Sequence, residues 1–468
     1  MNRIAILTTL CALAAAACSS DDKPATPMPD GGGETPSDTG VVRLDANITA
    51  NTTFTAGKTY VIPQRKQLFV EPGATLTIEP GTVIKGEQGS VLVITRGAKI
   101  LAAGTAAKPI VLTSAQDDDK KTPGFWGGLL VLGAAPINTN RDPVDPTKSR
   151  LEATFEAFTS AMPEGLFGGS DPHDNSGTLT YVRIEFAGFN FVADREFNNL
   201  TLCGVGDGTT IDYVQVHGGS DDGVEFFGGT VNVKHLVSSQ NQDDGFDTDN
   251  GWVGKAQFVI VQNVSHPATL PEASNGYESD NHADPATSYV LEPRTEPTIY
   301  NVTLIGDHAY AGVKSFAAVF RRGTAGHYFN HIWYGFPQGP EFRDEETRKQ
   351  LDARRLEIQY SMFYNNDTSS TNLPVAQSTP ATDINEALYL LPSGNVDPHN
   401  RFNVDPGFPA EVVSKSAPNF KPNAGAAALT AGVAPPSDGF FDTSATFAGA
   451  VGTVDWTAGW TKYPQPAN

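Results

Sequence analysis

Two stretches decide the fold of this chain: VEPGATL at Val70–Leu76 and ITRGAKI at Ile94–Ile100, whose glycines Gly73 and Gly97 lie 24 residues apart. Each stretch alternates apolar and polar residues across a glycine turn, which is typical of a short strand, a tight bend and another short strand. A weaker third copy, GKTY, begins at Gly57. Repeats of this length indicate a solenoid of stacked coils.

Two more pairs of segments recur further along the chain. Asp212–Val216 returns as Lys234–Ser238 after 22 residues, and Ile299–Thr303 returns as Tyr328–Ile332 after 29 residues. Spacings that stay above 20 but vary indicate coils of one basic size with residues inserted at a corner. We therefore expect an all-β protein, a right-handed parallel β-helix in which inward Val, Ile and Leu side chains form ladders.

The repeats also suggest boundaries. We expect the β-helix over residues 42–400, interrupted near 340–357 by a charged stretch that predicts an inserted helix with one modest apolar face. After residue 400 the repeats fade into Pro-, Ala- and Gly-rich sequence that includes WTAGW at Trp456–Trp460. Because a solenoid must cover its open end, residues 401–468 are predicted to be a cap that packs back on the last coils.

The N-terminal residues have the pattern of an exported lipoprotein. A cationic start, an apolar stretch and the small residues Ala14–Ala17 precede Cys18, so residues 1–17 predict a signal peptide and Cys18 a lipidated residue. In a bacterial lipobox, the residue three places before the cysteine is usually leucine, and here it is Ala15. Residues 18–41 have the composition of a flexible tether. In lipoproteins that resemble this chain, a residue such as Ser19 after the cysteine implies the outer membrane.

Composition narrows the class of partner. The 468 residues carry a net charge of −21, which repels phosphate backbones and makes nucleic acid an unexpected partner. After residue 17 no apolar run reaches the roughly 18 residues of a membrane helix. The three cysteines are Cys11, Cys18 and Cys203, so Cys203 has no disulfide partner once Cys18 is acylated. We expect Cys203 to be buried and the protein to be a monomer.

Acidic residues are most concentrated between residues 221 and 280. DDGVE at Asp221–Glu225 is repeated as DDGFD at Asp243–Asp247. If one coil is 22 residues long, equivalent carboxylates lie about 4.8 Å apart on adjacent rungs. The candidate metal ligands are Asp221, Asp222, Glu225, Asp243, Asp244, Asp247, Asp249, Glu278 and Asp280.

Three outcomes relieve the repulsion in such a cluster. In the first, the acids bind Ca²⁺ or another hard cation. In the second, some acids are protonated and serve a polysaccharide hydrolase or lyase, with Asp222, Asp243 and Asp244 as candidate catalytic residues. In the third, the acids face solvent or accept hydrogen bonds from the backbone amides of turns. An enzyme of this kind usually needs a basic residue near the acids. The candidates Arg183, Arg321 and Arg322 are distant in sequence, although coils can bring them onto one face.

Other candidate residues carry weaker signals. His217 and His235 flank the acidic rungs but are not equivalent, because 22 residues after His217 stands Ser239, so no paired histidine metal site is indicated. Trp126 and Trp252 stand beside glycines, which favours packed corners over sugar stacking. No cofactor-binding motif is present.

Several motifs together resemble a known family: LTIEPGTVIKG at Leu76–Gly86, KPIVLTS at Lys108–Ser114, WGG at Trp126–Gly128, DDG at Asp221–Gly223 and RRGTAG at Arg321–Gly326. The chain resembles bacterial secreted and lipoprotein β-helix proteins of the pectate-lyase-like superfamily from about residue 42 onward. The resemblance implies fold and export, and it supplies no catalytic residues.

The resulting functional expectation is an outer-membrane-anchored surface protein. Its solenoid is expected to bind a polysaccharide or another envelope component, with Ca²⁺ as the candidate ion. The alternatives are a polysaccharide hydrolase or lyase that uses the Asp221–Asp249 cluster, and a structural or adhesive surface protein without a site.

Overall fold

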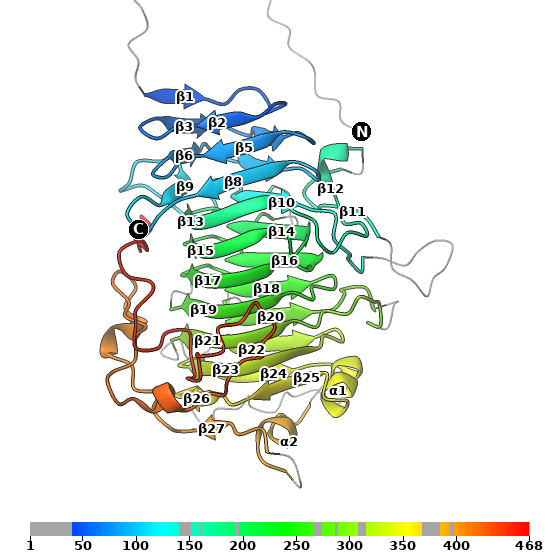
Figure 1. Cartoon of the computed structure of the whole chain (residues 1–468), viewed down its shortest axis with the longest axis vertical. Helices are drawn as coiled ribbons and strands as arrows, with labels where there is room; N and C mark the ends of the chain where they lie inside the picture. The colour runs from blue at the N-terminus through cyan, green and yellow to red at the C-terminus, as the bar shows by residue number, and fades with distance from the viewer. Residues whose placement is uncertain are drawn as a thin grey trace, which may run out of the picture. The chain divides into compact units, whose positions relative to one another are not determined.

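The computed structural model describes residues 40–139, 151–159, 161–191, 196–264, 274–285, 289–307, 315–366, 384–393 and 397–467. The predicted signal peptide, Cys18 and nearly all of the predicted tether lie outside these residues. From residue 40 onward the chain forms one compact unit of stacked parallel strands (Figure 1). Among the described residues, no helix has the length and apolar character needed to cross a bilayer.

One face of the solenoid is a parallel sheet, here called sheet B. Its strands, in stacking order, are β4 (Gln67–Val70), β7 (Val91–Ile94), β10 (Leu129–Leu132), β14 (Leu200–Val205), β16 (Val224–Gly229), β18 (Phe246–Asp249), β20 (Tyr277–Asp280), β22 (Phe316–Arg321) and β24 (Gln338–Phe342). The pairing of Val70 with Ile94 confirms the predicted 24-residue repeat. The weaker copy at Gly57 differs, because Thr59 pairs with Val83 and so aligns Gly57 with Gly81.

The remaining strands of the solenoid form sheet A. The first coils contribute two columns: β1 (Val41–Arg43), β3 (Thr59–Ile62), β6 (Val83–Gly86) and β9 (Ile110–Ser114), and beside them β2 (Thr52–Phe54), β5 (Thr75–Ile78) and β8 (Lys99–Ala103). Long bent strands then span both columns: β13 (Gly177–Glu185), β15 (Thr210–His217), β17 (Asn232–Ser239), β19 (Lys255–Asn263), β21 (Thr298–Gly306) and β23 (Gly326–Tyr334). The last described strands are β25 (Leu356–Gln359), β26 (Met362–Tyr364) and β27 (Arg401–Phe402). The predicted right-handed parallel β-helix is confirmed.

Helices are short and lie at the corners. The stretch predicted as a helix near 340–357 contains α1 over Glu345–Asp352 alone, capped by Asp344, whose side chain accepts the Thr347 amide. The residues before α1 continue sheet B as β24, because they complete the pairing of β22. The other short elements are α2 (Ala387–Leu390), the 3₁₀ turns Pro163–Gly165, Ala410–Val413 and Ala427–Thr430, and an antiparallel pair β11 (Ala153–Thr154) and β12 (Leu166–Phe167).

Inward side chains form continuous ladders between the sheets. In sheet B, pairing stacks Leu92, Leu129, Leu200, Val224 and Phe246 in one buried column. Burying a side chain of this size stabilises the fold by about 1.5–3 kcal/mol. Because each coil contacts its neighbours, one repeated apolar position generates the whole core.

A second ladder follows the bend in the long strands of sheet A. One residue per coil takes the left-handed conformation there, as Tyr181 (φ 49°), Tyr213 (φ 53°), His235 (φ 47°) and Phe258 (φ 61°) do. Their rings stack on one another with centroids 4.5, 4.2 and 5.0 Å apart. Stacking offsets the cost of a conformation that L residues normally avoid.

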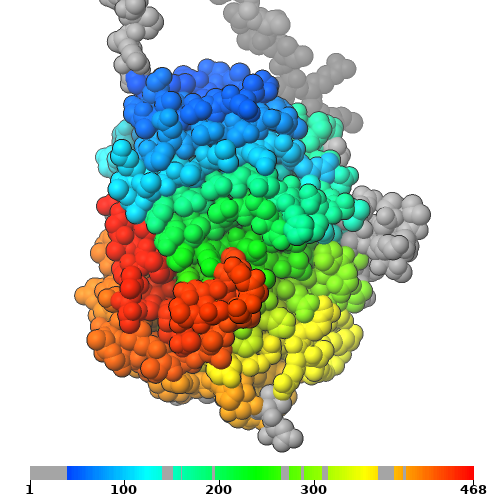
Figure 2. Space-filling model, viewed as in Figure 1, coloured from blue at the N-terminus to red at the C-terminus, as the bar shows by residue number. Residues whose placement is uncertain are grey.

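The C-terminal residues lie along the flank of sheet A. Outward polar side chains hold them: Gln215 donates to the Lys462 carbonyl (2.7 Å), and Asn301 donates to the Phe447 carbonyl (2.7 Å). The Ala467 amide donates to the Lys121 carbonyl (2.8 Å). Figures 1 and 2 show these orange and red residues running back beside the green coils. The segment predicted to cap the last coils packs on them, where Ala428 and Ala448 join Ile332 and Met362 in one buried cluster, and it also extends along the side of the solenoid. Residues 403–467 are here called the strap.

Candidate functional site

The acidic residues predicted from the repeats come together along sheet B and its adjoining corner. Glu225 pairs with Asp247, and Asp247 pairs with Glu278, so these residues occupy one column on β16, β18 and β20. Carboxylate oxygens of Asp221, Asp222 and Asp243 also lie within 4.8 Å of one another. The vertical register inferred from the sequence is confirmed. The acidic residues predicted as metal ligands are here called the acidic cluster: Asp221, Asp222, Glu225, Asp243, Asp244, Asp247, Asp249, Glu278 and Asp280.

Two of its members form part of a hydrogen-bonded ladder. Asp222 Oδ1 accepts the Asp244 amide (2.9 Å), and Asp244 Oδ1 accepts the Asn275 amide (2.9 Å). The ladder begins at Asn198, whose Oδ1 accepts the Asp222 amide (3.2 Å). Asp222 and Asp244 are 6% and 4% exposed. Each therefore uses one oxygen to hold the next coil, as the structural interpretation of acidic turn residues expects.

Carboxylate oxygens of the cluster converge in two groups. The first contains Asp221, Asp222 and Asp243, and the second contains Asp222, Glu225 and Asp247, with ligand oxygens within 4.8 Å in each. Two ligands on opposite sides of Ca²⁺, each 2.3–2.6 Å from the ion, are about 5 Å apart, so both groups fit such an ion. Buried Asp247 Oδ1 has no hydrogen-bond partner among the described residues. The donor set thus suits a hard cation.

Burial raises the pKa of the carboxyls in the cluster, and neighbouring carboxylates raise it further. Burial and then Glu278 raise the pKa of Asp243 to about 6, and burial and then Asp243 raise the pKa of Asp244 to about 7. The pKa of Asp249 rises to about 7 and that of Glu278 to about 8 for the same reasons. The pKa values of Asp221, Asp222, Glu225 and Asp247 are raised well above the ordinary range. Without a cation, several of these groups hold protons at neutral pH.

Two arginines close one end of the cluster. Arg321 Nε donates to Asp280 Oδ1 (3.0 Å), and Arg321 Nη2 donates to Glu278. Arg322 Nη1 donates to Asp280 Oδ2 (2.5 Å). The solenoid therefore places two of the three basic candidates beside the acids. The third, Arg183, lies on sheet A, where it pairs with Glu185 and donates to the Trp460 carbonyl.

Two further acids contribute to the cluster and were missed in the sequence. Glu196 raises the pKa of Asp221 and Asp243, and Glu156 raises the pKa of Glu225, in each case after burial. Glu156 stands next to Phe155, whose ring packs on Phe197 (5.5 Å between centroids). The sequence signal for Glu156 is its position between Phe155 and Phe158. This position does not reveal which coil the two phenylalanine rings cover.

The histidine, tryptophan and cysteine residues considered in the sequence analysis make contacts within the folded chain. His217 bonds to Ser239 Oγ (2.8 Å) and to the Pro464 carbonyl, while His235 bonds to Asp212 (2.8 Å). Trp126 and Trp252 are fully buried and donate to the Glu185 and Val231 carbonyls. Cys203 is free and buried, as expected. None of these side chains faces the acidic cluster as a described ligand.

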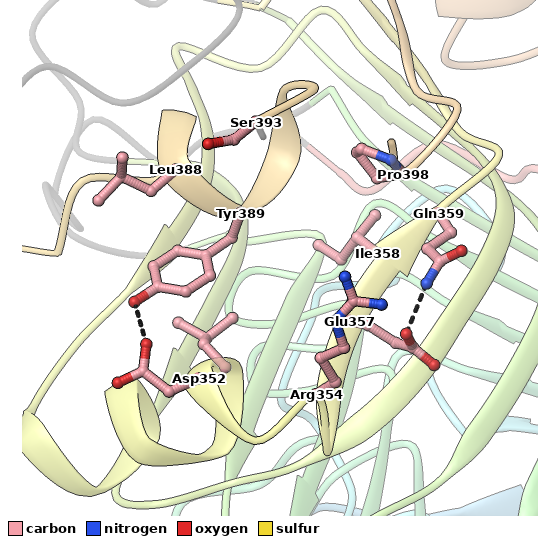
Figure 3. Close-up of a pocket in the computed structure, with 10 residues that line it drawn as sticks. Asp352, Arg354, Glu357, Ile358, Gln359, Leu388, Tyr389, Ser393 and Pro398 are labelled. Carbon is pink, nitrogen blue, oxygen red and sulfur yellow. Dashed lines mark hydrogen bonds between the residues drawn. The ribbon is translucent and has the colours of Figure 1, made fainter. Parts of the chain in front are cut away.

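A small pocket lies near the last strands of the solenoid, between α1, α2 and β25 (Figure 3). Its volume is about 230 Å³. Tyr389 donates to Asp352 (2.8 Å) and Gln359 donates to Glu357 (2.5 Å), so four of its polar side chains are paired with one another. The pocket contributes no reactive arrangement.

Comparison with known proteins agrees with the observed coils. A family model described as a pectate-lyase like beta helix domain matches residues 46–396. Neither the curated proteins nor the solved structures include a match to the chain. The match covers more than half of the sequence and nearly all of sheets A and B. The chain therefore belongs to the pectate-lyase-like β-helix domain family.

Proposed function

We propose that this protein is a lipid-anchored surface protein of the outer membrane whose acidic cluster binds Ca²⁺ and, through it, a polysaccharide of the cell envelope. The observation that carries the proposal is the convergence of Asp222, Glu225 and Asp247, whose ligand oxygens lie within 4.8 Å. The fold alone does not specify this function. The chemistry of the cluster supports it.

Charge balance favours a cation over the other outcomes. Arg321 and Arg322 pair with Glu278 and Asp280 at one end of the cluster. Among the described residues no ion pair reaches Asp222, Glu225 or Asp247, and buried Asp247 Oδ1 accepts no hydrogen bond. An unpaired buried carboxylate is costly, and a doubly charged ion relieves several at once.

Partial exposure of the cluster supports the link to a polysaccharide. Asp221, Glu225, Asp243 and Asp247 are neither fully buried nor fully exposed. An ion held by three protein groups has fewer ligands than the six to eight that Ca²⁺ prefers. Sugar hydroxyl or carboxylate oxygens are suitable additional ligands, which would make polysaccharide binding dependent on calcium.

Calcium titration of the full-length chain in detergent tests the ion. Binding is measured by calorimetry, and the melting temperature is measured with calcium and with a chelator. We expect calcium to raise the melting temperature, because a ligand that binds only the folded state stabilises it. The double variant Glu225→Gln/Asp247→Asn should lose the response.

The matched control replaces two exposed acids outside the cluster, Asp45→Asn and Glu411→Gln. It should keep the wild-type calcium response. Equal responses in both double variants, or no response in the wild type, would refute the proposed site.

A hydrolase or lyase is the second candidate, favoured by Arg321 beside carboxyls that can hold a proton near neutral pH. The test is release of sugar from envelope or plant polysaccharides by the wild type and by Asp243→Asn/Asp244→Asn. Asparagine retains an oxygen that can accept the Asn275 amide, so the fold should be preserved. Activity that vanishes while the circular dichroism is unchanged would establish the enzyme.

The lipid anchor is proposed from the residues around Cys18. Metabolic labelling with palmitate should label the wild type and not Cys18→Ser, while the buried Cys203→Ser control should still be labelled. Labelled protein should fractionate with the outer membrane. Label that persists in Cys18→Ser would refute the anchor.

A further inference from the structure

A cleft lies on the outer face of sheet A, beside the C-terminal strap. Its volume is about 630 Å³, and its floor is formed by outward residues of β6, β9 and β13. Lys462–Pro464 of the strap form the opposite wall. The strap is fixed at this point, because the Ala467 amide donates to the Lys121 carbonyl (2.8 Å) and Arg183 donates to the Trp460 carbonyl (3.0 Å). In Figure 1 the C-terminus is marked beside β9 and β13.

The lining of this cleft has the opposite charge from the rest of the molecule. Lys121 pairs with Asp118 (2.9 Å), and Arg183 pairs with Glu185 (3.1 Å). Lys85 and Lys462 also line the cleft, and neither forms an ion pair among the described residues. Asp117 and Asp118 interact electrostatically with Lys85, but each is already paired with another lysine. The cleft therefore has an excess of two positive charges on a chain whose net charge is −21. A cleft with an excess of positive charge concentrates anions locally.

A buried hydroxyl in the same cleft lacks a partner. Thr113 is 2% exposed, and its Oγ1 makes no hydrogen bond within the described part of the chain. Thr113 pairs with Lys85 across β6 and β9, so the two residues are neighbours in the lining of the cleft. Buried polar groups normally have a partner, so this hydroxyl is available to donate a hydrogen bond to a molecule bound in the cleft.

We infer that this cleft binds a phosphate monoester about the size of a sugar phosphate. The dianionic group matches the two unpaired lysines, and one of its oxygens accepts a hydrogen bond from Thr113. The volume exceeds what inorganic phosphate needs, and Val83, Val111 and Pro464 offer apolar surface to an organic body. The inference goes beyond the proposed function, because it concerns another face and requires no cation.

Calorimetry on the full-length chain in detergent, with a chelator present, tests the inference. The probes are glucose 1-phosphate, glucose, inorganic phosphate and a digalacturonate, at a pH where the monoester is a dianion. We expect glucose 1-phosphate to bind and glucose not to bind. The double variant Lys85→Gln/Lys462→Gln should weaken binding by about 100-fold, since each charge-assisted bond contributes about tenfold.

Two further variants separate binding from folding. Lys99→Gln/Lys421→Gln removes two exposed lysines outside the cleft and should leave binding unchanged. Thr113→Val should reduce binding by about tenfold without lowering the melting temperature, because the hydroxyl has no partner within the described protein.

The inference is overturned if glucose 1-phosphate does not bind, or if Lys85→Gln/Lys462→Gln binds it as tightly as the control. Equal binding of inorganic phosphate would remove the organic body from the inference, and tighter binding of digalacturonate would replace the phosphate ester with a uronate. None of these results affects the calcium test of the acidic cluster, so the two failures are distinguishable.

Discussion

The bend of sheet A and the acidic cluster of sheet B obey the same geometry but with opposite energetic consequences. At the bend, the rings of Tyr181, Tyr213 and His235 stack at 4.5 and 4.2 Å. On sheet B, Glu225 and Asp247 occupy paired positions in the same way. A solenoid places equivalent residues next to each other whatever their chemistry. Stacked rings attract, whereas stacked carboxylates repel unless protons, arginines or a cation neutralise them.

The comparison separates stability from function. The bend is covered by the strap, where the Trp460 ring packs against the Tyr181 ring (5.6 Å between centroids), and it holds the coils together. The acidic cluster stays partly open and concentrates unfavourable charge. Sites that destabilise the free protein in this way are typical of ligand-binding positions.

The largest expected effect is a loss of stability as the pH rises in the presence of a chelator. Burial raises the pKa of Asp243 to about 6, of Asp249 to about 7 and of Glu278 to about 8 in the folded chain. These carboxyls bind more protons when folded than when unfolded, where their pKa is about 4. Their stabilising contribution is therefore complete near pH 4 and is lost as the pH rises to about 8.

We expect the free energy of unfolding to fall by several kcal/mol between pH 5 and pH 8, at about 1.4 kcal/mol per unit of pKa shift. Urea unfolding at both pH values measures the change, and saturating calcium should reduce it. Tyr213 of the aromatic ladder contributes nothing in this range, because burial raises its pKa to about 12. A stability that does not change with pH would contradict the account of the cluster.

The next largest effect is expected for Arg321→Met. The substitution leaves Glu278 and Asp280 without one of their cationic partners and should cost about 2–4 kcal/mol at pH 8, measured by urea unfolding. The control Arg348→Met breaks exposed pairs with Glu345 and Asp352 on α1 and should have no measurable effect. Equal losses of stability in the two variants would mean that the ion pairs of Arg321 contribute no more than the exposed ion pairs of Arg348.

At the bend, Tyr213→Ala should cost about 2–3 kcal/mol, because it removes a ring stacked between two others and leaves a gap under the strap. Tyr213→Phe keeps the ring and should cost less than about 1 kcal/mol. Both are measured by urea unfolding. Calcium binding should be unchanged in both, and a loss of calcium affinity would show that the two regions are coupled.

The smallest expected effect is a gain. Asp247→Asn removes a carboxylate from the cluster and should stabilise the calcium-free protein by about 1 kcal/mol at pH 8 while abolishing its stabilisation by calcium. Asp45→Asn, an exposed acid on another coil, should change neither quantity. Destabilisation by Asp247→Asn without calcium would assign this carboxylate a structural role.

By itself, the sequence determined the parallel β-helix and the register of its acids, because a repeat of fixed length forces equivalent residues onto adjacent rungs. It determined, for example, that Glu225 would pair with Asp247. Only the tertiary structure placed Arg321 beside Asp280, set Glu156 and Glu196 near the cluster and ran the strap along sheet A to Lys121. These contacts join residues whose separations follow no repeat, so they depend on the lengths and paths of inserted segments rather than on a period.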